Sequence, residues 1–296
     1  MRRTRILGVA VVVVLAAAAL LAWPQAADQY AVSATGMVTY SLQNPAFTVT
    51  PLPDGSQEIV FTSRDWPVHG IYAAPATPGV HPAFVVLPGG NVRKEDEHRG
   101  LARDLRDLGF ATLTLDQRGI GATGGPFPPL EDQFTAFANR NEPEYHKMVA
   151  DAIAAARVLA ALPDVDPDAV FIAGVSMGGR VAIIAAAQDK GIGGVLAVST
   201  GGFPAVAGLP AEQERFLASI NPDAYVASLA PRPLVMIHAE QDPVIPLTAA
   251  EQTYALARQP KEFFSVLDAG HGYYTDRDRF FLEQSVATWT APGAGL

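Results

Sequence analysis

Short apolar runs alternate with amphipathic, helix-like segments along most of the chain after residue 56. The run 83–89 is continuously apolar and ends in glycine, which is typical of a strand buried on both faces. Strands are predicted at 57–63, 68–74, 83–89, 111–116, 169–174, 194–199, 233–239 and 262–268. Helices are predicted between them, at about 95–108, 142–162, 177–189, 247–258 and 275–290.

Regular alternation of strand and helix predicts an α/β fold. Right-handed crossovers would give a mostly parallel central sheet with helices on both faces. No repeat or second change of composition follows residue 56, so one domain is expected over 57–296. The polar segment 28–56 is predicted to be a tether with irregular strands, and 200–230 is long enough for a small two-helix lid.

The start of the chain has the pattern of an export signal. Arg2, Arg3 and Arg5 precede an uncharged apolar run over 6–23, which reaches the lower length limit for crossing a bilayer. Segment 1–27 is therefore expected to be a cleaved signal peptide or an uncleaved N-terminal membrane anchor. Both predict an exported, extracytoplasmic domain, either secreted or membrane-anchored.

Composition narrows the classes of partner. The 296 residues include 21 Lys and Arg against 30 Asp and Glu, a formal net charge of −9. An acidic protein is a poor match for a phosphate backbone, so no nucleic acid partner is expected. The chain has no cysteine, which excludes disulfides, thiolate metal sites and cysteine nucleophiles.

A candidate nucleophile lies directly after the strand predicted at 169–174. Gly174, Ser176 and Gly178 form a G-x-S-x-G motif between a strand and a helix. The turn would be too tight for a Cβ atom on either side of the serine, and the following helix N-terminus favours negative charge. This placement favours a catalytic serine over the alternative, a structural glycine loop.

A serine hydroxyl is a weak nucleophile that needs a base and an orienting acid. Asp242 and His271 each come just after a predicted strand, and the carboxyl ends of parallel strands meet at one edge of a sheet. Glu240 and Asp268 are rival acids, but Asp242 clears its strand and Asp268 is only three residues from the histidine. The remaining histidines are interpreted as surface or strand-packing groups: His69, His81, His98, His146 and His238.

Four motifs make the chain resemble the α/β-hydrolase superfamily over about residues 57–290, and most of all its dienelactone-hydrolase-like and bacterial esterase branch. They are GVSMGG at 174–179, AEQDPVIP at 239–246, AGHG at 269–272 and DQRGIGATGG at 116–125. The resemblance implies the α/β-hydrolase fold, with Ser176 as nucleophile, His271 as acid and base, and Asp242 as its orienting carboxylate. It implies neither a metal ion nor an organic cofactor.

The resemblance also implies an oxyanion hole made of backbone N–H groups. One would come from Met177 and the second from Gly90 or Asn91. Many relatives have His-Gly where this chain has Pro88 and Gly89, a change that backbone donors tolerate. True dienelactone hydrolases use a cysteine nucleophile, so their activity is not expected here.

Two other patterns are interpreted as structural. Segment 119–124 matches a dinucleotide-binding fingerprint, but the Gly/Pro stretch at 125–129 prevents the helix that would hold a pyrophosphate. Asp116 and Arg118 are expected to form an ion pair that holds this loop. The charged cluster at 94–98 is predicted to be a solvated helix start.

The expected function is therefore hydrolysis of a small-molecule carboxylic ester through an acyl-Ser176 intermediate. A serine peptidase of the aminopeptidase type and an acyltransferase are alternatives on the same fold. Esters lead because no carboxylate cluster suited to binding an amine is evident. An alternative of a different class is a binding protein with a catalytically dead site.

Overall fold

The computed structural model describes residues 28–267 and 269–290. The predicted signal peptide or anchor at 1–27 and the rival acid Asp268 lie outside the described residues. Within the described ranges, no helix has both the length and the apolar character needed to span a bilayer.

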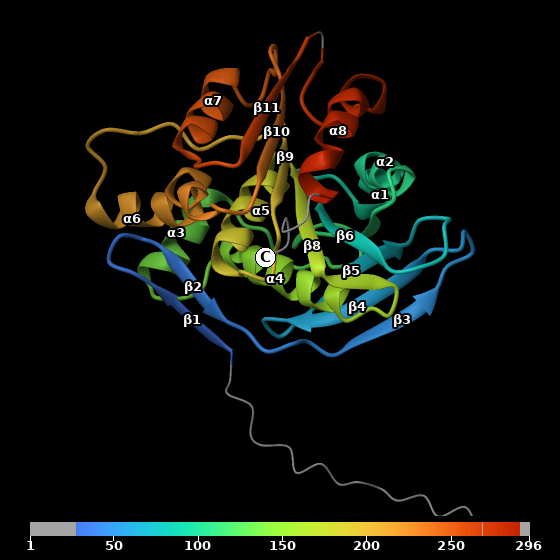
Figure 1. The fold of residues 1–296 in the computed structure, drawn as a ribbon. Coiled ribbons are helices and arrows are strands. Elements are labelled where there is room, and N and C mark those ends of the chain that lie inside the picture. Colours follow the sequence, from blue (N-terminus) through green and yellow to red (C-terminus); the bar gives the residue numbers. More distant parts are fainter. Residues whose placement is uncertain (1–27, 268, 291–296) are drawn as a thin grey trace, which may run out of the picture.

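A nine-stranded sheet runs through the centre of the molecule in the order β11-β10-β9-β8-β6-β7-β5-β4-β3 (Figure 1). The six strands from β11 to β7 are parallel, and β5, β4 and β3 continue the sheet in antiparallel pairs. The prediction of a mostly parallel sheet is confirmed. The strands are β3 (Phe47–Pro51), β4 (Gln57–Ser63), β5 (Trp66–Ala73), β6 (His81–Leu87), β7 (Ala111–Leu115), β8 (Val165–Val175), β9 (Val195–Val198), β10 (Leu234–Ala239) and β11 (Lys261–Val266).

Helices cover both faces of the sheet, as predicted (Figure 1). In the continuous apolar run of β6, Val85 faces one core and Phe84 the other, because successive strand residues point to opposite sides. The helices are α1 (Lys94–Arg99), α2 (Leu101–Asp107), α3 (Leu130–Ala138), α4 (Glu144–Ala160), α5 (Met177–Gln188), α6 (Ala211–Ile220), α7 (Leu247–Leu256) and α8 (Thr275–Thr290).

Residues 29–51, which hold β1, β2 and β3, are part of the folded domain. β1 (Gln29–Val32) and β2 (Val38–Ser41) form a separate antiparallel ribbon, and the Val38 N–H donates to the buried Tyr225 hydroxyl at 2.9 Å. β3 joins the main sheet, so the domain begins before residue 57. A tether was predicted because strands this short carry almost no pattern of their own, and contacts distant in sequence decide their placement.

The segment predicted as a two-helix lid contains a single α-helix. α6 is followed by two 3₁₀ turns, η1 (Pro222–Ala224) and η2 (Val226–Ser228), and it contacts α3, α4 and α5. Residues 204–208 form an exposed loop before α6.

The predicted ion pair between Asp116 and Arg118 is wrong. Asp116 is fully buried and accepts hydrogen bonds from Lys94 Nζ at 2.6 Å and from the Lys94 N–H at 2.9 Å. Arg118 Nε instead donates to Asp151 at 2.7 Å. Lys94 and Glu97 are buried, so α1 is not a solvated helix start either, and burial raises the pKa of Glu97 to about 7. No helix follows the fingerprint-like glycines until Leu130, as predicted.

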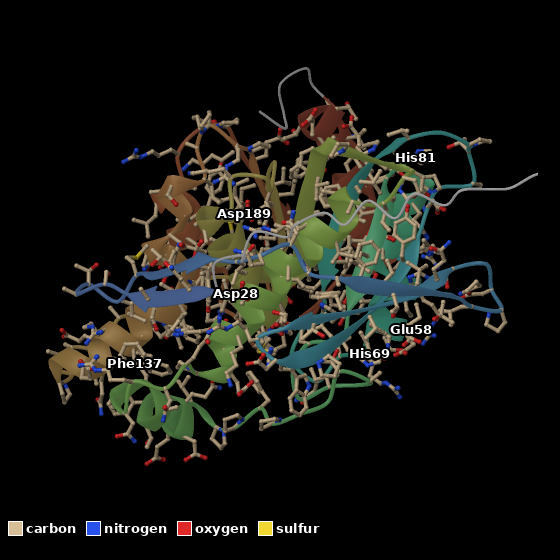
Figure 2. All side chains as sticks on the ribbon, turned by 90° about the horizontal axis from the view of Figure 1, so that it is seen from below. Asp28, Glu58, His69, His81, Phe137 and Asp189 are labelled. Atoms are coloured by element: carbon tan, nitrogen blue, oxygen red, sulfur yellow. The ribbon has the colours of Figure 1, made fainter. Side chains whose placement is uncertain are left out.

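Two histidines outside the predicted site, His69 and His81, make packing and surface contacts. His69 on β5 pairs with Glu58 on β4 at 3.1 Å, and the two side chains lie together in Figure 2. His81 is buried at the start of β6. Among the described contacts, His69 pairs with the single carboxylate of Glu58, and the His81 side chain pairs with no acid. Both agree with the interpretation of these histidines as structural groups.

Candidate active site

Ser176 occupies a sharp turn between β8 and α5. Its φ of 55° and ψ of −117° are unusual for a residue with a side chain, and such strain is concentrated at functional sites. A Cβ atom on Gly174 would lie 2.3 Å from the Gly178 backbone, and one on Gly178 would lie 2.2 Å from the Leu87 carbonyl oxygen. The two glycines of the motif are therefore required by close backbone approach, as the sequence predicted.

The structure brings Ser176, His271 and Asp242 together from three separate strand ends. His271 Nε2 lies 2.8 Å from Ser176 Oγ, and Nδ1 lies 2.8 Å from Asp242 Oδ2 and 3.0 Å from Oδ1. A carboxylate accepts only, so Nδ1 carries the proton and Nε2 presents its lone pair to the serine. This is the geometry of a nucleophile, a base and an orienting acid.

Asp242 is held in its ionised form. Its side chain has no exposed surface, and burial alone would raise its pKa. The N–H groups of Ile245 and Val244, at 2.9 and 2.8 Å, and His271 outweigh burial, and the net effect lowers the pKa. The rival Glu240 instead accepts a hydrogen bond from the exposed Ser265 hydroxyl at 2.7 Å.

Several groups that the sequence analysis missed hold the histidine loop. Ser199, at the end of β9, is in the left-handed region with φ of 45°. Its Oγ accepts from the Gly272 N–H and donates to the Gly272 carbonyl, both at 3.1 Å. The Tyr273 hydroxyl donates to the buried Asp104 at 2.9 Å, and the Tyr274 hydroxyl donates to the His271 carbonyl at 3.0 Å. The position of Ser199 directly after an apolar strand was the one available signal.

Two further residues brace the other members of the trio. Thr200 Oγ1 donates to the Ser176 carbonyl oxygen at 2.7 Å. His238, buried on β10, lies 2.9 Å from the Ile245 carbonyl through Nε2, and so fixes the loop that carries Asp242. Burial lowers the pKa of His238, and its neutral ring is a structural group, in keeping with its interpretation from sequence.

Of the residues predicted for the oxyanion hole, Met177 follows Ser176 directly, and the loop of Gly90 and Asn91 begins at Gly89, next to Ser176. Met177 is the first residue of α5, and a Cβ on Gly89 would lie 3.5 Å from the Ser176 Cβ. In the described part of the chain, the N–H groups of Met177, Gly90 and Asn91 donate to no protein acceptor. Asn91 has φ of 61°, and Gln117 Nε2 donates to the Pro88 carbonyl, which anchors the loop.

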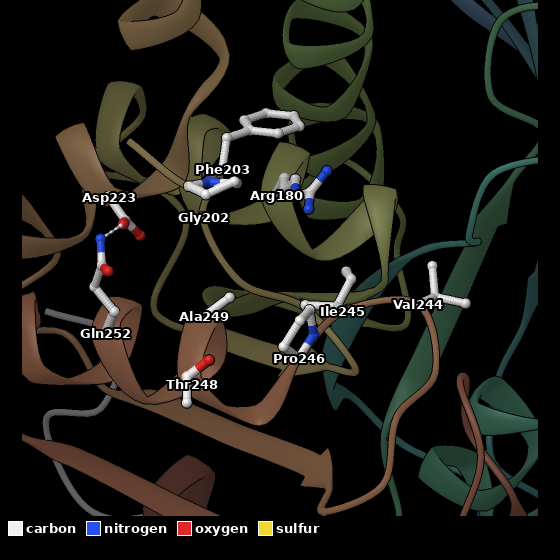
Figure 3. Close-up of a pocket in the computed structure, with 11 residues that line it drawn as sticks. Arg180, Gly202, Phe203, Asp223, Val244, Ile245, Pro246, Thr248, Ala249 and Gln252 are labelled. Atoms are coloured by element: carbon white, nitrogen blue, oxygen red, sulfur yellow. Dashed lines mark hydrogen bonds between the residues drawn. The ribbon is translucent and has the colours of Figure 1, made fainter. Parts of the chain in front are cut away.

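A cavity of about 360 Å³ lies between the loops that follow β9 and β10, and residues close in sequence to Ser176 and Asp242 line it (Figure 3). Arg180, one turn after Ser176 on α5, and Phe203 form one wall, and Asp223 and Gln252 lie across from them. Val244, two residues after Asp242, closes one end. The described residues contain no group of three or more acids and histidines arranged to hold a metal ion.

Comparison with known proteins supports this assignment of the fold. The acetyl xylan esterase (AXE1) family model matches residues 56–200. The uncharacterized protein YfhR of Escherichia coli is 26% identical over 229 residues, covering 75% of each chain. The uncharacterized protein Rv2307c of Mycobacterium tuberculosis is 29% identical over 226 residues, covering 74% of this chain and 73% of the relative.

Acetyl xylan esterase 1 from a Thermoanaerobacterium species superposes with a TM-score of 0.68 at 17% identity, over 84% of this chain and 89% of that one. Its fold is thus shared, although most of its side chains differ. The chain therefore has the α/β-hydrolase fold, and its residues 56–200 are similar to the acetyl xylan esterase family.

Proposed function

We propose that the chain hydrolyses small-molecule carboxylic esters through a covalent acyl-Ser176 intermediate. The observation that carries the proposal is the continuous hydrogen-bonded path from Ser176 Oγ through His271 to the buried Asp242. A hydroxyl is activated at neutral pH only when a base is aligned to accept its proton, and both contacts of the His271 ring are within hydrogen-bonding distance.

In the first half of the reaction, Ser176 Oγ attacks the ester carbonyl carbon while His271 Nε2 takes the hydroxyl proton. The carbonyl oxygen becomes an oxyanion beside the N–H groups of Met177 and of Gly90 or Asn91, which have no competing acceptor in the protein. His271 then gives its proton to the departing alcohol, leaving the acyl group on Ser176.

In the second half, His271 takes a proton from water, whose oxygen attacks the acyl carbon. Collapse of the second oxyanion breaks the bond to Ser176, and His271 returns the proton to Oγ. Asp242 stabilises the imidazolium that forms in each half without itself being protonated, which agrees with its lowered pKa.

The test compares hydrolysis of p-nitrophenyl acetate by the full chain, by Ser176→Ala and by Ser265→Ala as a matched control. Loss of a triad nucleophile removes several orders of magnitude in rate, so Ser176→Ala is expected to lose at least about 10³-fold in kcat. The exposed Ser265 lies on β11 outside the site, so its variant should keep the wild-type rate. A fluorophosphonate adduct should form on the wild type and not on Ser176→Ala. Equal activity of the wild type and Ser176→Ala would refute the proposed nucleophile.

A further inference from the structure

Arg180 lies in the wall of the cavity between the loops that follow β9 and β10. Its Nε donates to the Gly201 carbonyl at 2.8 Å, and the guanidinium carbon lies 4.0 Å from the centre of the Phe203 ring (Figure 3). One ring face and one carbonyl therefore fix the plane of the guanidinium. Its Nη1 and Nη2 groups donate to no acceptor in the described part of the chain.

The charge of Arg180 also lacks a carboxylate partner. Among the other arginines, Arg118 pairs with Asp151 and Arg157 with Asp189. Arg232 is buried without a carboxylate partner, but its Nη1 donates to three backbone carbonyls. No acidic group lies within salt-bridge distance of Arg180 in the described residues. Burial lowers the pKa of Arg180, but a guanidinium remains charged in a protein. Burying a cation without a partner costs free energy, and a bound anion would offset this cost.

Asp223, the acid across the cavity, is already engaged by its own wall. Its carboxylate accepts from Thr253 Oγ1 at 2.5 Å and from Gln252 Nε2 at 2.9 Å. Asp223 and Arg180 are the charged residues that line the cavity. Each carboxylate oxygen of Asp223 thus accepts from a neutral donor of its own wall, while the Nη groups of Arg180 have no such partner.

The rest of the lining suits a short carbon chain. Phe203, Val244, Ile245 and Ala249 give the cavity apolar sides. Arg180 follows Ser176 by four residues, about one helical turn with a rise of about 6 Å, so the two residues lie close together along α5. A planar guanidinium matches a carboxylate through two parallel hydrogen bonds.

We propose that Arg180 binds a carboxylate carried by the ester substrate, so that the preferred substrates are half-esters of short dicarboxylic acids. This inference rests on the proposed function and assigns the substrate class of the same site. The Nη groups without a protein acceptor, the hydrogen bonds that hold Asp223 and the apolar lining of the cavity carry it together.

The test measures kcat/KM for monomethyl glutarate and for dimethyl glutarate, which differ by one methyl group and one charge. Wild-type protein is expected to prefer the half-ester by at least about tenfold, because each charge-assisted contact to the guanidinium favours the anion. Arg180→Gln should abolish this preference, and Arg180→Lys should keep part of it. Lys190→Gln, which removes a surface cation just beyond the end of α5, should leave the preference unchanged.

The outcomes separate this proposal from the esterase proposal. Ser176-dependent hydrolysis of p-nitrophenyl acetate with no preference for monomethyl glutarate would overturn the role of Arg180 and leave the esterase intact. A preference that persists in Arg180→Gln would do the same. Should no ester turn over, thermal unfolding with free glutarate tests the binding site alone. Protection of the wild type but not of Arg180→Gln supports it, and equal behaviour overturns it.

Discussion

His271 and His146 each form hydrogen bonds through both ring nitrogens, but they differ in their partners and in their exposure to solvent. His271 lies between the carboxylate of Asp242 and the hydroxyl of Ser176, with 21% of its side chain exposed. His146 on α4 is fully buried, with Nδ1 2.7 Å from the Tyr30 hydroxyl and Nε2 2.7 Å from Ser219 Oγ.

The direction of each hydrogen bond explains the difference. Ser219 donates its proton to the Phe216 carbonyl at 2.5 Å, so its Oγ accepts from His146 Nε2, and Nδ1 accepts from Tyr30. This ring is neutral, and burial lowers its pKa to about 3. His146 therefore connects β1, α4 and α6 as a fixed bracket. A carboxylate and access to solvent, rather than a full set of hydrogen bonds, make a histidine able to exchange protons.

Replacing each histidine by alanine tests whether His271 affects the rate and His146 affects the stability. His271→Ala is expected to lose at least about 10³-fold in kcat for p-nitrophenyl acetate with little change in the free energy of unfolding. His146→Ala should keep its kcat but lose about 3 kcal/mol of stability, because it leaves a cavity and takes away the acceptor of the Tyr30 hydroxyl. Rates and urea unfolding of both variants measure the two effects. A large loss of kcat in folded His146→Ala would contradict the bracket role.

The pH dependence of the free energy of unfolding tests whether the buried His146 ring is neutral. An unfolded histidine binds a proton below about pH 6.5, whereas folded His146 stays neutral down to about pH 3. Its contribution to stability is thus fully present above about pH 6.5 and is lost as the pH falls toward 3. Between pH 7 and pH 5 the wild type should lose about 2 kcal/mol more than His146→Gln. Urea unfolding at both pH values gives the difference, and parallel losses in the two proteins would be inconsistent with a buried neutral ring.

The smallest expected effect comes from Tyr30→Phe, which removes only the hydroxyl that donates to His146. The free energy of unfolding should fall by about 1 kcal/mol, the usual net value of one hydrogen bond. The double variant Tyr30→Phe with His146→Ala should lose less stability than the sum of the losses in the two single variants, because both substitutions remove the same contact. Full additivity in urea unfolding would mean that the hydrogen bond contributes nothing.

The part of the site predicted from sequence depended on local signals. The G-x-S-x-G motif predicts a tight turn from the local sequence. An Asp or His just after a strand is placed at the carboxyl edge of the parallel sheet. Ser176, Asp242 and His271 were therefore brought to one place by topology alone.

What sequence did not predict depends on which distant side chain fills a buried space. Asp116 is two residues from Arg118 in sequence, but the strand end buries it against Lys94, 22 residues away. The ribbon at 29–41 has weak strand patterns, and its place is set by Tyr30 and Val38 contacting α4 and the segment after α6. The unpaired state of Arg180 likewise depends on the surrounding walls and leaves no trace in its sequence neighbours.

The position of His271 after β11, the edge strand of the sheet, sets when the chain acquires its chemistry during synthesis. Ser176 precedes it by 95 residues, so a growing chain carries the nucleophile long before its base exists. α8 then follows, and its Trp289 packs edge-on against Phe84 and Phe171 in the central core, with ring centres 5.3 and 5.4 Å apart. If Ser176 and His271 act as proposed, a chain that ends before residue 271 lacks the base, which enters the sequence just ahead of α8.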